Sequence, residues 1–332
     1  MTQQPFLNIT MPVFNRPELT ALTITSLRKC TDAVPFILTV VDNGSDQTLV
    51  TWLRQQHRKG QIDKLFLLPQ NMGISCACNI GWQMTPAAYF CKLDNDMFIQ
   101  SPTWLEHIFS LWRHGLPLST LGPAWGEKET LKNGAAVTTP EGNLGYCLTN
   151  LPGCALFVPK AVSDLLGYFN EDYGLYGAED GDYGLRINCA GFPQYTYNCD
   201  GLLRHMGKWP DSILEQYRAH GLNRENEHRR LFQNQDGTMG MFPVNHYLFN
   251  ACIRNWRVPL RYEIADIADD GNVHLRERKE YRLVKEALLL CKQKMDRVCM
   301  ETGNYGNIWN PGFIEELKEV MKSCGQECVP LP

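Results

Sequence analysis

The chain has 332 residues, of which 44% are hydrophobic and 20% charged, and its formal net charge is −4 at pH 7. This composition is typical of a globular protein with one large or two ordinary domains. The negative charge disfavours a surface built mainly for nucleic acid or anionic lipid. No apolar run approaches the ~20 residues of a transmembrane helix, and residues 1–5 do not resemble a signal peptide. We therefore expect a cytoplasmic protein whose 13 cysteines are reduced core thiols.

Strand and helix patterns alternate through the first hundred residues. Short apolar runs predict strands at 6–13, 36–41, 65–68 and 89–93. Apolar residues at helical spacing predict three intervening helices, which begin near Pro17, near Ser45 or Asp46, and after Gly73. Four strands alternating with three helices predict parallel βαβ units in a doubly wound sheet.

The fourth predicted strand ends in Asp94 and Asp96, two carboxylates one residue apart. Acids this close repel each other unless a cation lies between them. Mg²⁺ and Mn²⁺ usually bind one or two carboxylates together with substrate phosphates, and open α/β sheets bind ligands at the carboxyl ends of their strands. Asp42 ends the second strand and should lie along the same edge. Nucleotide contact and simple turn formation are both open roles for it.

Other nucleotide-binding and metal motifs are missing or incomplete. No Gly-x-Gly-x-x-Gly follows the first strand, which disfavours a dinucleotide oxidoreductase. The stretch 201–209 resembles a P-loop, but it has one residue too many between its glycines and lacks the final Ser or Thr. The closest cysteine pairs, Cys76 with Cys78 and Cys324 with Cys328, belong to no four-ligand set, so structural zinc is not expected.

The middle of the chain contains a long segment without a clear periodic pattern. An amphipathic helix is predicted at 104–114, a strand at 153–158 and a helix at 159–166. Residues 115–149, between these elements, are rich in Gly, Pro and Thr. A segment of this kind in a compact domain predicts a lid, a binding loop or disorder.

A second acidic cluster, formed by Glu179, Asp180 and Asp182, begins a helix that Gly191 ends. Acids at a helix start are favoured by the dipole and supply caps, which explains one or two of the three. The same position keeps a carboxylate ionised, as a general base must be. Asp182 has a structural alternative, an ion pair with Arg186 one turn later.

His205 follows a predicted strand at 195–197 and lies beside two cations, Arg204 and Lys208. A single histidine is usually a surface or core residue. It becomes a candidate metal ligand if the aspartates hold a metal.

These stretches, in this order, resemble the GT-A glycosyltransferases, specifically the large family 2 of inverting enzymes. The similarity covers roughly residues 5–208 and lies in six segments, 10–16, 41–45, 71–81, 93–96 (the DxD motif), 153–158 and 176–182 (the ED motif). The resemblance implies an α/β fold of the GT-A type, with a Rossmann-like, mostly parallel sheet flanked by helices. It also implies a glycosyltransferase domain at 1–208, with a nucleotide-binding half at 1–100 and an acceptor-binding half at 101–208.

The resemblance also implies roles for individual residues. Asp180 is expected to be the catalytic base, with Glu179 as the runner-up and Asp182 third. A Mn²⁺ or Mg²⁺ ion is expected on Asp94, Asp96 and His205. The expected donor-binding residues are Pro12, Phe14, Asp42, Asn71, Gly73 and Asp94, with Asp42 at the nucleotide base.

One position departs from the family pattern. Members usually have Arg where this chain has Cys78, so cationic help from this helix is not expected. Arg204, Lys208 and Arg186 are the candidates that could compensate for it.

Residues 209–332 lie outside the resemblance and are expected to form a mainly helical C-terminal extension. The pattern predicts a β-hairpin at 261–276 and an amphipathic helix at 280–299. The basic stretches 204–230 and 254–261 are typical of solvated faces. Acceptor recognition, oligomerisation and docking to a membrane or nucleic acid remain open roles for the extension.

The sequence therefore predicts a metal-dependent, inverting hexosyl- or pentosyltransferase that uses a nucleotide-diphospho sugar, a UDP-sugar being favoured. The acceptor is left open among a glycan, a lipid carrier, a protein and a nucleic acid base. Two alternatives stand beside this prediction. One is a sugar nucleotidyltransferase on a similar sheet, and the other is a non-catalytic protein that binds a nucleotide sugar.

Overall fold

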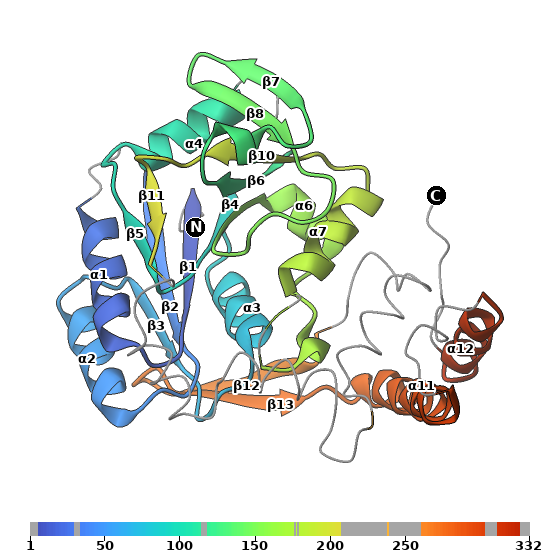
Figure 1. The fold of residues 1–332 in the computed structure, drawn as a ribbon. Coiled ribbons are helices and arrows are strands. Elements are labelled where there is room, and N and C mark those ends of the chain that lie inside the picture. Colours follow the sequence, from blue (N-terminus) through green and yellow to red (C-terminus); the bar gives the residue numbers. More distant parts are fainter. Residues whose placement is uncertain are drawn as a thin grey trace.

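The structure is a computed structural model that describes residues 6–29, 34–113, 118–175, 177, 179–206, 238, 260–302 and 311–325. A central sheet crosses the main body, and helices cover both of its faces (Figure 1). The predicted fold class is confirmed, because most strands of the sheet run in one direction and the described part of the C-terminal extension is mainly helical.

The N-terminal half follows the predicted alternation closely. Its strands and helices are β1 (Leu7–Val13), α1 (Pro17–Arg28), β2 (Phe36–Asp42), α2 (Gln47–Arg58), β3 (Lys64–Leu67), α3 (Ile74–Met84) and β4 (Tyr89–Leu93). The four strands pair in parallel in the order β3-β2-β1-β4. Helices α1 and α2 lie on one side of these strands and α3 on the other, as a doubly wound sheet requires (Figure 1).

Helix α3 lies unusually close to the sheet. A Cβ atom added at Gly81 would lie 2.4 Å from Cγ2 of Thr10 on β1, so a larger residue does not fit there. Asn8 on the same strand donates hydrogen bonds to the carbonyl oxygens of Gly81 and Thr85, which satisfies groups at the end of the helix. The last turns of α3 are thereby held against β1.

The prediction for residues 115–149 was wrong, because most of this segment is regular structure. It contains β6 (Thr120–Ala124), α5 (Glu127–Thr130), β7 (Ala135–Thr139) and β8 (Gly142–Tyr146). All three strands belong to the central sheet, whose full order is β3-β2-β1-β4-β9-β6-β10-β8-β7. The Gly, Pro and Thr residues that suggested a loop are accommodated because β7 and β8 form an edge hairpin and β6 carries Pro123 beside its parallel partner β10.

The remaining elements of the main body enclose the acidic residues. They are β5 (Met97–Ile99), α4 (Trp104–Arg113), β9 (Ala155–Pro159), α6 (Lys160–Leu166), the 3₁₀ helix η1 (Glu171–Tyr173), α7 (Glu179–Cys189), β10 (Gln194–Asn198) and β11 (Leu203–His205). Strand β9 is antiparallel to its neighbours β4 and β6. Strand β11 pairs with β5 in a small separate sheet, with His205 opposite Met97. This pairing brings His205 next to the chain that follows β4.

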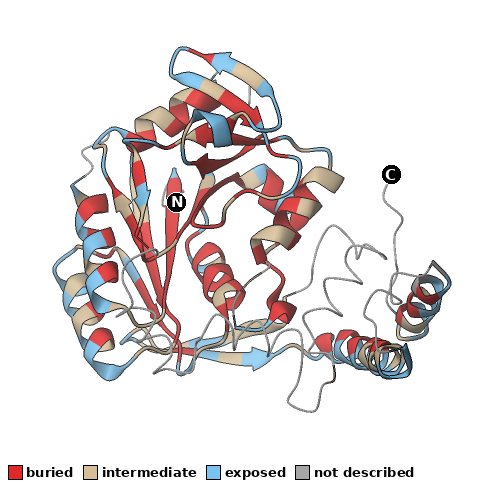
Figure 2. Ribbon diagram, in the orientation of Figure 1, coloured by how far each residue is buried: buried red, intermediate tan, exposed pale blue. Residues whose placement is uncertain are grey.

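Within the described residues, the C-terminal part contains the predicted hairpin and two helices. The hairpin is β12 (Tyr262–Ile267) and β13 (Val273–Glu277), and the helices are α11 (Tyr281–Thr302) and α12 (Pro311–Ser323). The hairpin packs on the main body, since Leu67 donates its N–H to Gly271 and Glu171 accepts the N–H groups of Arg261 and Tyr262. Figure 2 shows the buried central strands and the exposed outer side of the hairpin. The domain boundary at residue 208 stays a prediction.

Helices α11 and α12 pack against each other around a small core of their own. This core contains Tyr281, Val284, Leu288, Cys291, Met295 and Leu317. Among the residues that the structure describes, no helix is both long and apolar enough to cross a membrane.

Candidate functional site

Three parallel strands bring the first candidate residues to one edge of the sheet. Asp42 lies opposite Val13, the last residue of β1, and Lys92 on β4 lies opposite Thr10. Asp94 and Asp96 follow β4 directly, and Arg16 follows β1. The predicted convergence at the carboxyl ends of the strands is therefore present for β1, β2 and β4.

Asp94 is bound to a buried lysine that the sequence analysis did not select. Nζ of Lys92 lies 2.8 Å from Oδ1 of Asp94 and donates a second hydrogen bond, also of 2.8 Å, to the carbonyl oxygen of Gly153. The Lys92 side chain is 1% exposed, whereas that of Asp94 is 27% exposed. Burial raises the pKa of Asp94, and Lys92 opposes that rise. A charged residue inside an apolar strand was the available signal for Lys92, because buried lysines require a partner.

Asp96 lies between two basic side chains. Nη1 of Arg16 is 2.6 Å from its Oδ2, and Nε2 of His205 is 3.4 Å from its Oδ1. Burial raises the pKa of Asp96, but His205 and Arg16 together outweigh it, so its pKa lies below the usual range. The contact with Asp96 raises the pKa of His205. Oδ1 of Asp96 is buried and accepts no hydrogen bond.

These contacts explain how two carboxylates can lie close together without a metal ion. The repulsion between Asp94 and Asp96 is relieved by Lys92 and Arg16, one cation on each carboxylate. Repulsion alone therefore does not require a metal ion at this site. The case for a metal depends instead on which carboxylate oxygens remain available.

Glu179, the first residue of α7, is linked to Asp94 through the same lysine. Its Oε1 lies 3.6 Å from Nζ of Lys92, and its Oε2 is buried without a hydrogen-bond partner. Burial raises the pKa of Glu179 to about 7. Lys92 thus joins the acid at the end of β4 to the acid at the start of α7.

Asp180 is positioned by backbone groups and is less buried than Glu179. Its Oδ2 accepts the N–H of Gly153 at 3.1 Å, and its Oδ1 accepts the N–H of Gly181 at 2.7 Å. A Cβ added at Gly153 would lie 3.0 Å from Nζ of Lys92 and 3.1 Å from Cβ of Asp180. The glycine lets the two side chains approach each other from β4 and α7.

Asp182 has a structural role, the ion pair with Arg186 that was the alternative to a catalytic role. It forms an ion pair with Arg186 one turn later, with both side chains at most 1% exposed, and it accepts a hydrogen bond from Tyr173. Arg186 also donates to the carbonyl oxygens of Leu166 and Tyr168, so its guanidinium is held within the core. Arg186 therefore does not supply the positive charge that family members usually carry at the position of Cys78.

Arg204 and Lys208 were the two other candidates for a cation that compensates for Cys78. Arg204 is an exposed residue on β11, opposite Phe98, and Lys208 lies outside the described residues. Cys78 is fully buried, and Lys92 is the cation that acts on it electrostatically. Lys92 therefore supplies a positive charge next to α3 from the neighbouring strand.

The predicted donor loop is organised by side-chain amides. Oδ1 of Asn71 accepts hydrogen bonds from Asn43 and from the N–H of Gly73, and Oδ1 of Asn43 accepts the N–H of Met72. Asp42 is buried, and its Oδ2 accepts the N–H of Ser45 while its Oδ1 has no partner. Burial raises the pKa of Asp42. An unsatisfied buried acceptor at this edge is suited to a ligand's donor group.

The two other predicted donor residues lie on and just after β1. Pro12 is buried and lies opposite Val41 in the sheet, and Phe14 is half-buried at the start of the loop that carries Arg16. One aromatic residue that the sequence analysis left in the supposed lid also belongs here. Trp125 follows β6, is 40% exposed, and its ring centroid lies 6.2 Å from that of His205.

The oxygens that remain available suit a divalent cation only in part. Oδ1 of Asp96 has no hydrogen-bond donor and adjoins Nε2 of His205, which fits a metal ligand pair. Among the described residues, no group of three or more His, Cys, Asp or Glu side chains is arranged to hold a metal ion. Mg²⁺ and Mn²⁺ need fewer protein ligands when substrate phosphates and water complete the shell. The residues fit a cation that is held jointly by the protein and a diphosphate.

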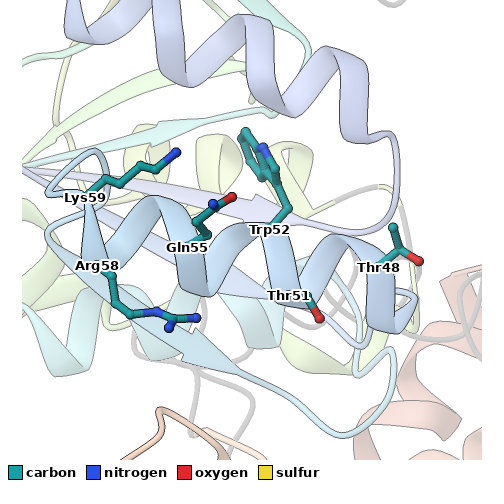
Figure 3. Close-up of a pocket in the computed structure, with 6 residues that line it drawn as sticks. All are labelled: Thr48, Thr51, Trp52, Gln55, Arg58 and Lys59. Carbon is teal, nitrogen blue, oxygen red and sulfur yellow. The ribbon is translucent and has the colours of Figure 1, made fainter.

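A separate surface hollow of about 450 Å³ lies on the outer side of α2 (Figure 3). It is lined by Thr48, Thr51, Trp52, Gln55, Arg58 and Lys59. None of these is a predicted site residue, and α2 contributes no described side chain to the acidic site. We assign it no part in the chemistry at the strand ends.

With this geometry established, comparison with known proteins identifies the N-terminal segment. Residues 8–133 match the family described as Glycosyl transferase family 2. The segment is a family 2 glycosyltransferase segment. It runs from β1 to α5, and it contains Arg16, Asp42, Lys92, Asp94 and Asp96.

The chain is also similar to a curated relative, the hyaluronan synthase of Pasteurella multocida. The two are 22% identical over 256 residues, which cover 65% of this chain and 26% of the relative. The chain thus spans about a quarter of the length of this relative.

Among solved structures, a mannosyltransferase from Pyrobaculum calidifontis, in complex with GDP-Man and Mn²⁺, has a TM-score of 0.49 and 11% identity, with 98% of this chain and 87% of that chain covered. TarS from S. aureus has a TM-score of 0.46 and 15% identity, with 74% of this chain and 44% of that chain covered.

Proposed function

We propose that this protein is an inverting glycosyltransferase that transfers a sugar from a nucleotide-diphospho sugar, with a UDP-sugar favoured, to an acceptor hydroxyl or amine. The observation that carries the proposal is the contact of Lys92 with both Asp94 and Glu179. It joins the acids at the end of β4 and the acids at the start of α7 into one site. The family 2 match over residues 8–133 supports the same reaction class.

On this proposal the donor lies along the carboxyl edge of β1, β2 and β4. Asp42 meets the nucleotide base, the amide-bonded loop at Asn71 and Gly73 borders the nucleotide, and Pro12 and Phe14 line its other side. Asp94, Asp96 and His205 would hold a Mn²⁺ or Mg²⁺ ion. When bound, that ion would neutralise the charge that develops on the leaving diphosphate.

Asp180 is the proposed general base. Both of its oxygens accept backbone N–H groups, which fix its position, and its side chain is only partly buried. It takes the proton of the acceptor nucleophile while the nucleophile bonds to the anomeric carbon and the bond from that carbon to the diphosphate breaks. Attack from the face opposite the diphosphate inverts the anomeric centre. Glu179 is the second candidate, but it is more deeply buried and lies against Lys92.

The first test is a donor screen on the purified chain. Thermal stabilisation and sugar release are measured with UDP-, GDP- and dTDP-sugars, with and without Mn²⁺. Donor-dependent hydrolysis or transfer supports the proposal. Pyrophosphate formation from a nucleoside triphosphate would point to a nucleotidyltransferase, and donor-dependent stabilisation without turnover would point to a binding protein.

The second test separates the two candidate bases. Asp180→Asn should still bind donor while kcat falls by roughly 10²–10⁴-fold, the usual contribution of positioned proton transfer. Asp164→Asn removes an exposed carboxylate on α6 that pairs with Lys160, and it serves as the matched control. Unchanged turnover in Asp180→Asn would move the base to another residue.

A further inference from the structure

The loop between β1 and α1 has an unusual backbone that directs Arg16 onto Asp96. Asn15 and Arg16 have φ values of 54° and 60°, in the left-handed region that residues other than glycine seldom occupy. Such a conformation persists only where its surroundings enforce it.

Three neighbouring residues hold Asn15 and Arg16 in this left-handed conformation. Oγ of Ser45 accepts the N–H of Asn15 at 2.8 Å, and Oδ1 of Asn15 accepts the N–H of Asp46 at 3.0 Å. Asn95, between the two aspartates, donates to the carbonyl oxygen of Asn15 and to Oγ1 of Thr20. The loop is therefore tied both to the turn between β2 and α2 and to the acid pair.

The resulting ion pair occupies one side of the Asp96 carboxylate. Nη1 of Arg16 lies 2.6 Å from Oδ2, and the two side chains are 17% and 7% exposed. The other oxygen, Oδ1, has no hydrogen bond and lies 3.4 Å from His205. A divalent cation bound by Asp96 would consequently lie close to a guanidinium in a partly desolvated site, where like charges repel strongly.

A diphosphate removes this conflict. Its negative charges attract both the divalent cation and the guanidinium, and Arg binds phosphate oxygens with the same fork that it offers a carboxylate. Arg16 is partly exposed, so its side chain has access to a ligand at the strand ends.

We propose that Arg16 occupies the cation position at Asp96 in the donor-free protein and passes to the donor's diphosphate when a metal ion binds there. This inference rests on the proposed function. Its consequence is that the protein binds Mn²⁺ weakly alone and tightly together with a nucleoside diphosphate. Arg16 is then both a competitor of the metal and a ligand of the donor.

Binding measurements without turnover test this directly. In the unaltered protein, calorimetric titration should give a Mn²⁺ dissociation constant at least 10-fold lower with saturating UDP or GDP than without nucleotide. In Arg16→Asn, which removes the charge and keeps a residue suited to left-handed backbone, Mn²⁺ alone should bind at least 5-fold more tightly. The same variant should bind UDP or GDP at least 5-fold more weakly.

Two control variants make the comparison specific. Arg16→Lys keeps a positive charge and should retain most of the effect of nucleotide on Mn²⁺ affinity. Arg28→Asn removes the Arg28–Asp63 pair at the other end of α1, which has a similar distance of 2.7 Å and an arginine of similar exposure, 20%. It should leave the affinities for Mn²⁺ and nucleotide unchanged.

The failing outcomes are distinct. Equal Mn²⁺ affinity with and without nucleotide overturns the inference, and this result comes from the unaltered protein alone. Nucleotide-enhanced Mn²⁺ binding that Arg16→Asn leaves unchanged overturns the role of Arg16 while the proposed function stands. Absence of any nucleotide binding overturns the proposed function and the inference together.

Discussion

Nζ of Lys92 lies 3.6 Å from Oε1 of Glu179, and this contact joins β4 to the first turn of α7. The same ammonium binds Asp94 and the carbonyl oxygen of Gly153 at 2.8 Å each. A single buried cation therefore holds together acids that are 85 residues apart in the sequence, since 179 − 94 = 85.

Lys92→Met should destabilise the protein by about 3 kcal/mol, because removing one partner of a buried ion pair leaves its carboxylates uncompensated. Urea denaturation followed by circular dichroism measures the change. Lys132→Met removes the exposed Lys132–Glu129 pair and should cost less than about 1 kcal/mol. Equal effects of the two substitutions would show that the contacts of Lys92 are energetically unimportant.

Glu179 should make stability decrease as pH rises from about 4.3 to about 7. Its carboxyl has an ordinary pKa of about 4.3 in the unfolded chain, whereas burial raises the pKa to about 7 in the folded protein. Between these values the folded state binds more protons, so the unfolding free energy falls with pH. Glu179→Gln removes this pH-dependent contribution to stability. The unfolding free energy of the variant, relative to that of the unaltered protein, should therefore rise by up to about 3 kcal/mol between pH 5 and pH 8.

The measurement is a pair of urea titrations at each pH. A difference that stays constant between pH 5 and pH 8 would contradict the raised pKa. Asp164→Asn, at an exposed carboxyl on α6, is the control and should show no such change.

Asp182→Asn should reduce stability by about 3 kcal/mol, because it leaves the buried guanidinium of Arg186 without its carboxylate. Asp180→Asn should reduce stability by less than about 1 kcal/mol, since its hydrogen bonds are to backbone N–H groups at a partly exposed position. Thermal unfolding of the two variants gives the comparison. A larger loss at Asp180 than at Asp182 would reverse the structural and catalytic assignments of the two residues.

Gly73→Ala should destabilise the turn that starts α3. Gly73 has φ 92°, and an added Cβ would lie 2.3 Å from the carbonyl oxygen of Gly174. Gly60 also has a positive φ, of 71°, but an added Cβ meets nothing within 4 Å. Gly60→Ala should cost about 1 kcal/mol and Gly73→Ala more than about 2 kcal/mol, measured by urea denaturation. Equal costs would mean that backbone strain, and not the contact with Gly174, sets the effect.

Local sequence patterns predicted most of the elements but failed in residues 115–149. Buried strands such as β1 and β2 are short apolar runs, and their neighbours have helical spacing, so both appear in the sequence. Strands β7 and β8 form an edge hairpin with exposed, small and polar residues, and the hairpin joins the sheet through the pairing of β8 with β10. Pairing between distant segments leaves no periodic signal of this kind in the sequence.

The amino-acid sequence by itself determined which acids end strands and which begin a helix, because strand and helix periodicities and chain breaks are local properties. Only the tertiary structure decided which cation meets which acid. Lys92 reaches Glu179 because β4 and α7 pack together. Arg16 reaches Asp96 because contacts with Ser45 and Asn95 hold its loop in a left-handed conformation. Ion pairs depend on distances of a few ångströms between segments far apart in the chain, and folding alone sets those distances.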